Sequence, residues 1–179
     1  MQILFSLLYA PIVFLSLQYF DVKSVSIFVF VISLIWFFVQ KEKKEFFAML
    51  PLLYMLFSIF AFFTEEFIVL KSLPLLISAS FSGLLFFSYL QKKSIILYFA
   101  EKFSTDPIPQ EEKVYIHHST LFWFYITLLN TAIHLMLFLE SNMHFWLYYS
   151  SIGWYVLFIG AGVIQFLHRR YIFLRRSHG

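Results

Sequence analysis

The sequence predicts an all-α polytopic membrane protein, a bundle of about six transmembrane helices that forms one integral membrane domain over residues 1–179. The first observation is the composition, which is 61% hydrophobic and only 13% charged, whereas soluble domains are about 45–50% apolar and about 25% charged. The second is a mean hydropathy of +0.80. The third is that the few charges separate apolar runs of nearly membrane-spanning length. Together these exclude an ordinary soluble domain, a disordered chain and a free-standing nucleic-acid-binding protein.

The apolar runs end where charged or polar clusters begin. A helix needs about 20 mostly apolar residues to cross a bilayer, and the sequence offers six such runs. The predicted spans are residues 3–20, 24–39, 46–63, 67–90, 120–139 and 145–167. The first run has no Lys or Arg before it and no small-residue cleavage site near Asp21. We therefore expect a retained helix there, with a cleaved signal peptide as the alternative.

The positions of the cations predict the orientation. Loops on the cytoplasmic side are enriched in Lys and Arg. All Lys and Arg residues except Lys23 and Lys71 fall in the 40–45 loop, the 91–119 loop or the C-terminal segment, which alternate along the six predicted spans. We therefore expect both termini to be cytoplasmic.

The one long loop contains an amphipathic stretch at residues 94–103. Ile95, Ile96, Phe99 and Phe103 share one helical face, so this stretch is expected to lie in the cytoplasmic interface of the membrane. The sequence Asp106-Pro107-Ile108-Pro109 ends it, because proline cannot continue a helix. Polar residues 110–113 are expected to complete a hinge-like connector before the fifth span.

The polar residues of this loop favour no catalytic centre. The chain has no cysteine, which excludes disulfides, a thiolate nucleophile and Cys-ligated zinc. His117-His118 follows Glu111 by six residues, but this spacing matches none of the usual zinc frames, and polar contacts at headgroup level are the expected role. Asp106 and the pair Glu111-Glu112 could form an acid/base pair, although a solvated face is favoured. We predict no catalytic residue, no metal and no cofactor.

Four polar residues in the fifth predicted span form a candidate binding face. Thr127, Asn130, Thr131 and His134 are three or four positions apart and so share one side of a helix. Polar groups in hydrocarbon normally face protein or water. Interhelical hydrogen bonding is the favoured interpretation, and a polar lining for a substrate or proton path, with Asn130 and His134 as binding residues, is the alternative.

Glu65, Glu66 and Lys71 form the second candidate binding element, where the third predicted span ends and the fourth begins. Lys71 is about one turn inside the fourth span. A lysine that extends to the outer interface is one explanation, and an ion pair with a glutamate facing a periplasmic pocket is the other. In the same span, Ala79 and Gly83 form a small-xxx-small pair that allows helices to approach closely.

Several segments carry a resemblance to a known family. Three segments match: Glu66-Phe67-Ile68 with Lys71, Phe81-Ser82-Gly83-Leu84-Leu85, and Lys92-Lys93-Ser94-Ile95-Ile96. The arginine-rich end also matches, as do single residues at corresponding places, which are Pro11, Asp21, Asn130, Trp146 and Gly153. In these the chain resembles the intracellular septation protein A family of bacterial inner-membrane proteins. Leu70 stands where the family has tryptophan, Ser94 where it has proline, and Ile116-His117-His118 departs from its usual pattern. These departures indicate a divergent or sister group.

The resemblance implies a non-enzymatic role in cell-envelope synthesis, integrity or division. It implies partners among other inner-membrane envelope or division proteins, besides the lipid bilayer, and no nucleic acid. It supplies no active site, because the family has no established catalytic activity. The alternatives are a small lipid or solute transporter, or an accessory protein of acyl-lipid biosynthesis. An intramembrane enzyme is disfavoured, because no nucleophile, base and metal ligands converge by spacing.

Overall fold

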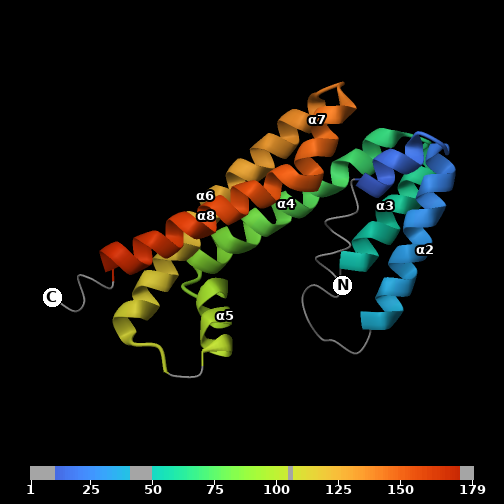
Figure 1. Cartoon of the computed structure of the whole chain (residues 1–179). Helices are drawn as coiled ribbons and strands as arrows, with labels where there is room; N and C mark the ends of the chain where they lie inside the picture. The colour runs from blue at the N-terminus through green and yellow to red at the C-terminus, as the bar shows by residue number, and fades with distance from the viewer. Residues whose placement is uncertain (1–10, 41–49, 105–106, 174–179) are drawn as a thin grey trace. The chain divides into compact units, whose positions relative to one another are not determined.

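The computed structural model describes residues 11–40, 50–104 and 107–173, and these residues are almost entirely helical. Residues 11–17 are helical at the start of the described chain. The elements that follow are α2 (Val22–Gln40), α3 (Leu50–Thr64), α4 (Phe67–Leu90), α5 (Ile95–Phe103), α6 (Gln110–Leu139), α7 (Met143–Tyr148), the π-helical turn η2 (Tyr149–Gly153), α8 (Trp154–His168) and the π-helical turn η3 (Arg169–Phe173) (Figure 1). The described part of the chain contains no strand, so the predicted all-α class is confirmed there.

Four helical stretches in the described ranges are long and apolar enough to cross a membrane. They are Val22–Val39, Phe67–Leu90, Gln110–Leu139 and Met143–Tyr171. The chain is therefore compatible with a multi-pass membrane protein. The other two predicted spans stay predictions: α3 has 15 residues, with positions 46–49 outside the described residues, and of the run 3–20 only positions 11–20 are described, with residues 11–17 helical.

The prediction of a hinge-like connector at residues 110–113 is wrong. α6 begins at Gln110, so residues 110–113 form its first turn and no hinge-like connector. Glu111 and Glu112 stabilise that turn, because carboxylates favour the positive end of a helix dipole, and the Lys113 amide donates to the Pro109 carbonyl at 3.0 Å. The 30 residues of α6 extend about 45 Å, which exceeds a hydrocarbon core of about 30 Å. The charged first turns can therefore continue the helix beyond the bilayer.

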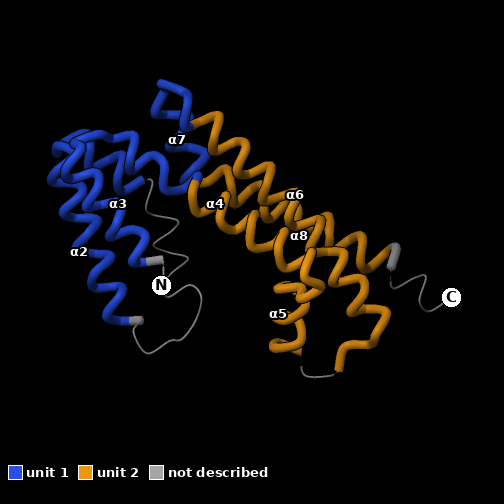
Figure 2. Tube along the Cα trace, turned by 180° about the vertical axis from the view of Figure 1, so that it is seen from behind, with its two compact units in different colours: residues 1–75, 138–151 blue, residues 76–137, 152–179 orange. Residues whose placement is uncertain are grey.

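The chain divides into two compact units, and the first comprises residues 1–75 and 138–151 (Figure 2). In it α2 and α3 run antiparallel, since Trp36 near the end of α2 meets Tyr54 near the start of α3, with ring centroids 5.9 Å apart. Its buried apolar side chains include Val25, Val29, Ala61, Leu70 and Leu73. The hydroxyls of Ser26, Ser33 and Ser58 each donate to the carbonyl four residues earlier. These buried polar groups are thus satisfied within their own helices.

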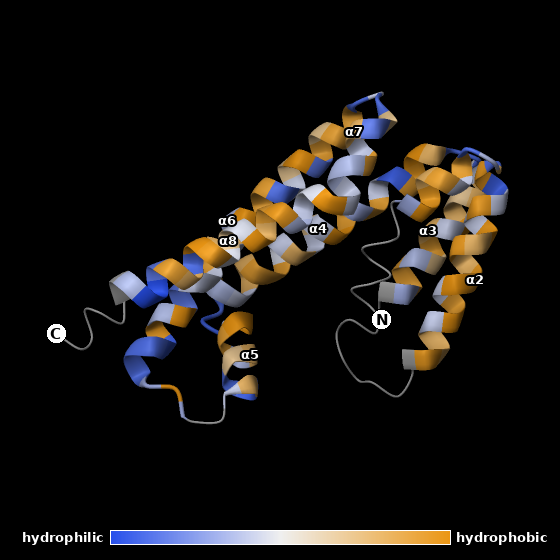
Figure 3. Cartoon of the chain, viewed as in Figure 1, coloured by the Kyte–Doolittle hydropathy of each residue, from blue (hydrophilic) through white to orange (hydrophobic). Residues whose placement is uncertain are grey.

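The second unit comprises residues 76–137 and 152–179. Here α6 contacts both α4 and α8, through ring pairs of Phe86 with Phe124 (4.9 Å) and Trp123 with Phe158 (6.0 Å). Both contacts join antiparallel helices. Large apolar side chains remain exposed along these helices, whereas hydrophilic residues gather at the start of α6 and the end of α8 (Figure 3). This distribution suits helices surrounded by lipid.

Candidate functional site

The five candidate site residues fall into two groups. Glu65, Glu66 and Lys71 belong to the first compact unit, whereas Asn130 and His134 belong to the second. Each group is built from its own set of helices.

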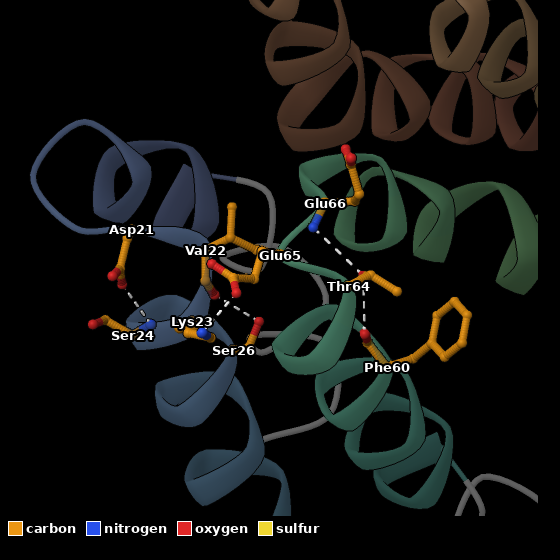
Figure 4. Close-up of polar contacts among 9 residues, drawn as sticks. All are labelled: Asp21, Val22, Lys23, Ser24, Ser26, Phe60, Thr64, Glu65 and Glu66. Carbon is orange, nitrogen blue, oxygen red and sulfur yellow. Dashed lines mark hydrogen bonds and ion pairs between the residues drawn. The ribbon is translucent and has the colours of Figure 1, made fainter.

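Glu65 ends α3 in a backbone conformation that is unusual for a glutamate. Its φ is +59°, the left-handed region that favours glycine, and its amide donates to the Ala61 carbonyl at 2.9 Å. Its carboxylate lies 2.6 Å from the ammonium of Lys23 (Figure 4). The same ammonium lies 5.9 Å from the centre of the Phe62 ring. Both charged side chains are about half exposed. An ion pair of this kind contributes only about 0–1 kcal/mol to stability.

Asp21 caps the neighbouring helix start. Its carboxylate accepts a hydrogen bond of 2.8 Å from the Ser24 amide, at the N-terminus of α2. Hydrogen bonding from Ser24 holds the pKa of Asp21 below its ordinary value, because these bonds favour the charged carboxylate. Beside Asp21 and Glu65 lies an open cleft of about 450 Å³, with Phe14, Phe20 and Phe67 among its lining residues. Two acids and several aromatic rings thus share one cleft of the first unit.

Glu66 makes a different contact from its neighbour. Its amide donates weakly to the Thr64 hydroxyl at 3.4 Å, and its carboxylate points away from the pair of Lys23 and Glu65 (Figure 4). Glu66 is exposed, so its charge is available at the surface of the described unit.

Lys71 has a partner that the sequence did not predict. Its side chain is only 6% exposed, and its ammonium donates to the backbone carbonyl of Glu140. Glu140 directly follows α6, so this carbonyl lies at the negative end of the α6 dipole, where a cation is stabilised. The alternative in which Lys71 pairs with Glu65 or Glu66 is not what the structure shows, since Glu65 pairs with Lys23. Glu65 and Glu66 precede the first residue of α4, and the Lys71 side chain contacts the residue that follows α6.

Phe67 lies one turn before Lys71 and packs against α7. Its ring meets the ring of Trp146 edge-on, with centroids 5.6 Å apart and an angle of 88°. Trp146 is 1% exposed, and its indole N–H has no acceptor among the described residues. The first two turns of α4 thus carry a buried cation and a buried aromatic contact. The spacing of Phe67 and Lys71 shows that they share a face, but a backbone carbonyl has no sequence signature that would identify Glu140.

In the second group, Asn130 links α6 to α4 through hydrogen bonds. The Asn130 side-chain amide donates to the Ser78 hydroxyl at 2.8 Å, and that hydroxyl lies 2.9 Å from the hydroxyl of Thr131. Thr131 also donates to the Thr127 carbonyl at 2.8 Å. Asn130 and His134 are buried, with 5% and 4% of their surface exposed. This arrangement of amide and hydroxyl groups forms interhelical hydrogen bonds.

The histidines at the start of α6 serve in packing contacts. His117 stacks on Tyr89 of α4 at 4.9 Å, and the Tyr115 hydroxyl lies 3.1 Å from a ring nitrogen of His168. Within the described ranges, no three His, Asp or Glu side chains lie close enough together to hold a metal ion. The side chains present can bind through hydrogen bonds, ion pairs and aromatic faces.

Comparison of the chain with protein-family models, curated proteins and solved structures found no match.

Proposed function

We propose that the chain is a non-enzymatic, multi-pass membrane protein that associates with other membrane proteins and supports cell-envelope synthesis, integrity or division. The proposal includes six spans, cytoplasmic termini, residence in the bacterial inner membrane, and α5 at the cytoplasmic interface. The role in the envelope is the one that the resemblance to the septation protein A family implies. The structural support for this proposal is that polar side chains within the helices form hydrogen bonds to a neighbouring helix.

The hydrogen bonds of Asn130 carry this proposal. A substrate path needs polar side chains that face water or a ligand. Asn130 instead donates to Ser78, and Ser78 is bonded in turn to Thr131. These groups hold α4 and α6 together, which favours the structural interpretation over the transporter.

Open space beside three glycines supports association with a further helix. A Cβ atom added to Gly83 of α4, or to Gly160 or Gly162 of α8, would meet no atom of the described residues within 4 Å. Close packing among the described helices therefore does not require these glycines. Helices of membrane proteins commonly approach each other at small residues, so these positions suit contact with another protein.

The test compares Gly83→Leu and Gly160→Leu with Phe87→Leu, which alters an exposed apolar side chain of α4. We expect all three variants to reach wild-type membrane levels and thermal stability, because the glycine sites have room. After cross-linking in native membranes, the two glycine variants should lose co-purifying membrane proteins that wild type and Phe87→Leu retain. An unchanged set of partners in all variants would contradict the proposal. Labelling of Asn130→Cys by a water-soluble thiol reagent would favour the transporter instead.

The element of Glu66 and Lys71 provides a second test of the same proposal. Lys71→Met keeps the length of the side chain and removes its hydrogen bond to Glu140, and Glu66→Gln removes one exposed charge. We expect both variants to insert at normal levels and to lose cross-linked partners. If both retain those partners, the element is only a helix boundary.

A further inference from the structure

Both ends of α5 contact α6 through polar side chains. The Ser94 hydroxyl caps α5 by accepting from the Leu97 amide at 3.0 Å, and it lies 2.6 Å from the Thr120 hydroxyl. At the other end, the Glu101 carboxylate is 2.7 Å from the Lys113 ammonium. Glu101 lies seven positions after Ser94, which is close to two helical turns. Both anchors therefore lie on the side of α5 that faces α6.

The opposite side of α5 is aromatic and uncovered. Phe103 lies two positions beyond Glu101, and so on the opposite side of the helix. Its ring stacks on that of Phe99 at 6.3 Å, and the two residues are 77% and 38% exposed. α5 has no buried residue. Because the contacts to α6 are made by one side of α5, the apolar surface on its other side is not packed against the other helices of the described unit.

Three lysines lie in α5 or in the turn that precedes it. Lys92, Lys93 and Lys102 are exposed, and none of them takes part in an ion pair with the described residues. The turn after α4 is defined, because the amides of Lys92 and Lys93 donate to the carbonyls of Tyr89 and Ser88, both at 3.0 Å. The charge of Glu101 is compensated by Lys113. α5 and the turn before it therefore carry a positive excess, and hydrophilic residues mark that turn in Figure 3.

We propose that α5 and the preceding turn bind anionic phospholipids of the leaflet at which α4 ends. An amphipathic helix with aromatic residues on one side and lysines beside it inserts its apolar face at the boundary of headgroups and acyl chains. Phe99 and Phe103 would occupy that boundary, and Lys92, Lys93 and Lys102 would contact lipid phosphates. The inference rests on the proposed interfacial position of α5, and it is independent of association with partner proteins.

The absence of cysteine permits a direct measurement with one label. Ile96→Cys, on the same face as both phenylalanines, is labelled with an environment-sensitive fluorophore. The labelled protein is placed in nanodiscs of phosphatidylcholine with and without phosphatidylglycerol, and lipids with shallow spin labels serve as quenchers. We expect blue-shifted emission and strong quenching, both increasing with the fraction of phosphatidylglycerol.

The charge requirement is tested by replacing the three lysines with glutamine, singly and together. Each replacement should weaken the preference for anionic lipid about fivefold, whereas Arg170→Gln, at a cation outside α5, should leave it unchanged. Emission typical of water, or equal quenching with and without phosphatidylglycerol, would overturn the inference. A blue-shifted label that lipid quenchers do not reach would also overturn it, because a protein would then cover the face. None of these outcomes bears on the glycine variants, which test association separately.

Discussion

At the scale of single residues, Glu65 combines an unfavourable backbone with a favourable ion pair. Its positive φ costs a non-glycine residue about 1 kcal/mol or more, and the pair with Lys23 returns little at its exposure. Glu65→Ala and Glu65→Gly both remove the pair, but only glycine relieves the backbone. We expect Glu65→Gly to be more stable than Glu65→Ala by about 1 kcal/mol, as measured by unfolding in detergent. Equal stabilities would show that the residue is not left-handed in the folded protein.

Asn130 offers a second measurement at this scale. Its hydrogen bond to Ser78 should contribute an interaction energy of about 0.6 kcal/mol, and at most about 1.7 kcal/mol, as measured for such pairs in membrane proteins. The experiment is a double-mutant cycle of Asn130→Ala and Ser78→Ala. Additive effects of the two substitutions would contradict the contact. The cycle isolates this pair, because each alanine removes a partner without adding a new one.

At the scale of elements, the start of α2 links stability to pH. Hydrogen bonding from Ser24 lowers the pKa of Asp21 from its ordinary value of 3.8. The folded state therefore favours the charged carboxylate, and this contribution is present above that value and is lost as the pH falls through the lower folded-state pKa. We expect wild type to lose thermal stability below about pH 4 more steeply than Asp21→Asn, which keeps an acceptor but has no charge. Parallel profiles would contradict the cap.

Elements also differed in how well the sequence predicted them. α4 is predicted at residues 67–90 and observed at Phe67–Leu90, because Glu66 and Gln91 bound a mostly apolar run in which Lys71 is the one charged residue. α6 begins at Gln110, ten residues before the apolar run predicted as the fifth span, because the polar residues ahead of that run are also helical. Pro109 followed by two acids was the available signal for a helix start. A rule based on hydropathy marks where a helix enters lipid, and it does not mark where the helix begins.

At the scale of the whole molecule, the alternation of cations predicts the topology. Reporter fusions after Lys44, Glu66, Lys102, Asn142 and Arg176 should show the first, third and fifth positions in the cytoplasm and the other two outside, because Lys and Arg favour cytoplasmic loops. Periplasmic reporter activity at Lys44 or Arg176 would exclude the six-span arrangement.

Patterns of charge and hydropathy do not predict which side chains contact each other. The spacing of Asn130 and His134 predicts that they share a face, but that Ser78 accepts the hydrogen bond of Asn130 depends on how two helices are rotated.

The contact between Lys71 and the Glu140 carbonyl has a consequence for biogenesis. The two residues are 69 positions apart, and a ribosome adds about 5–20 residues per second, so Lys71 is made roughly 3–14 s before its acceptor. A lysine at the centre of a span costs about 2.5–3.5 kcal/mol to insert, and less near the interface. During that interval the start of α4 must remain in contact with water, headgroups or the insertion machinery. The hydrogen bond between Lys71 and Glu140 can therefore form only after the end of α6 has been synthesised.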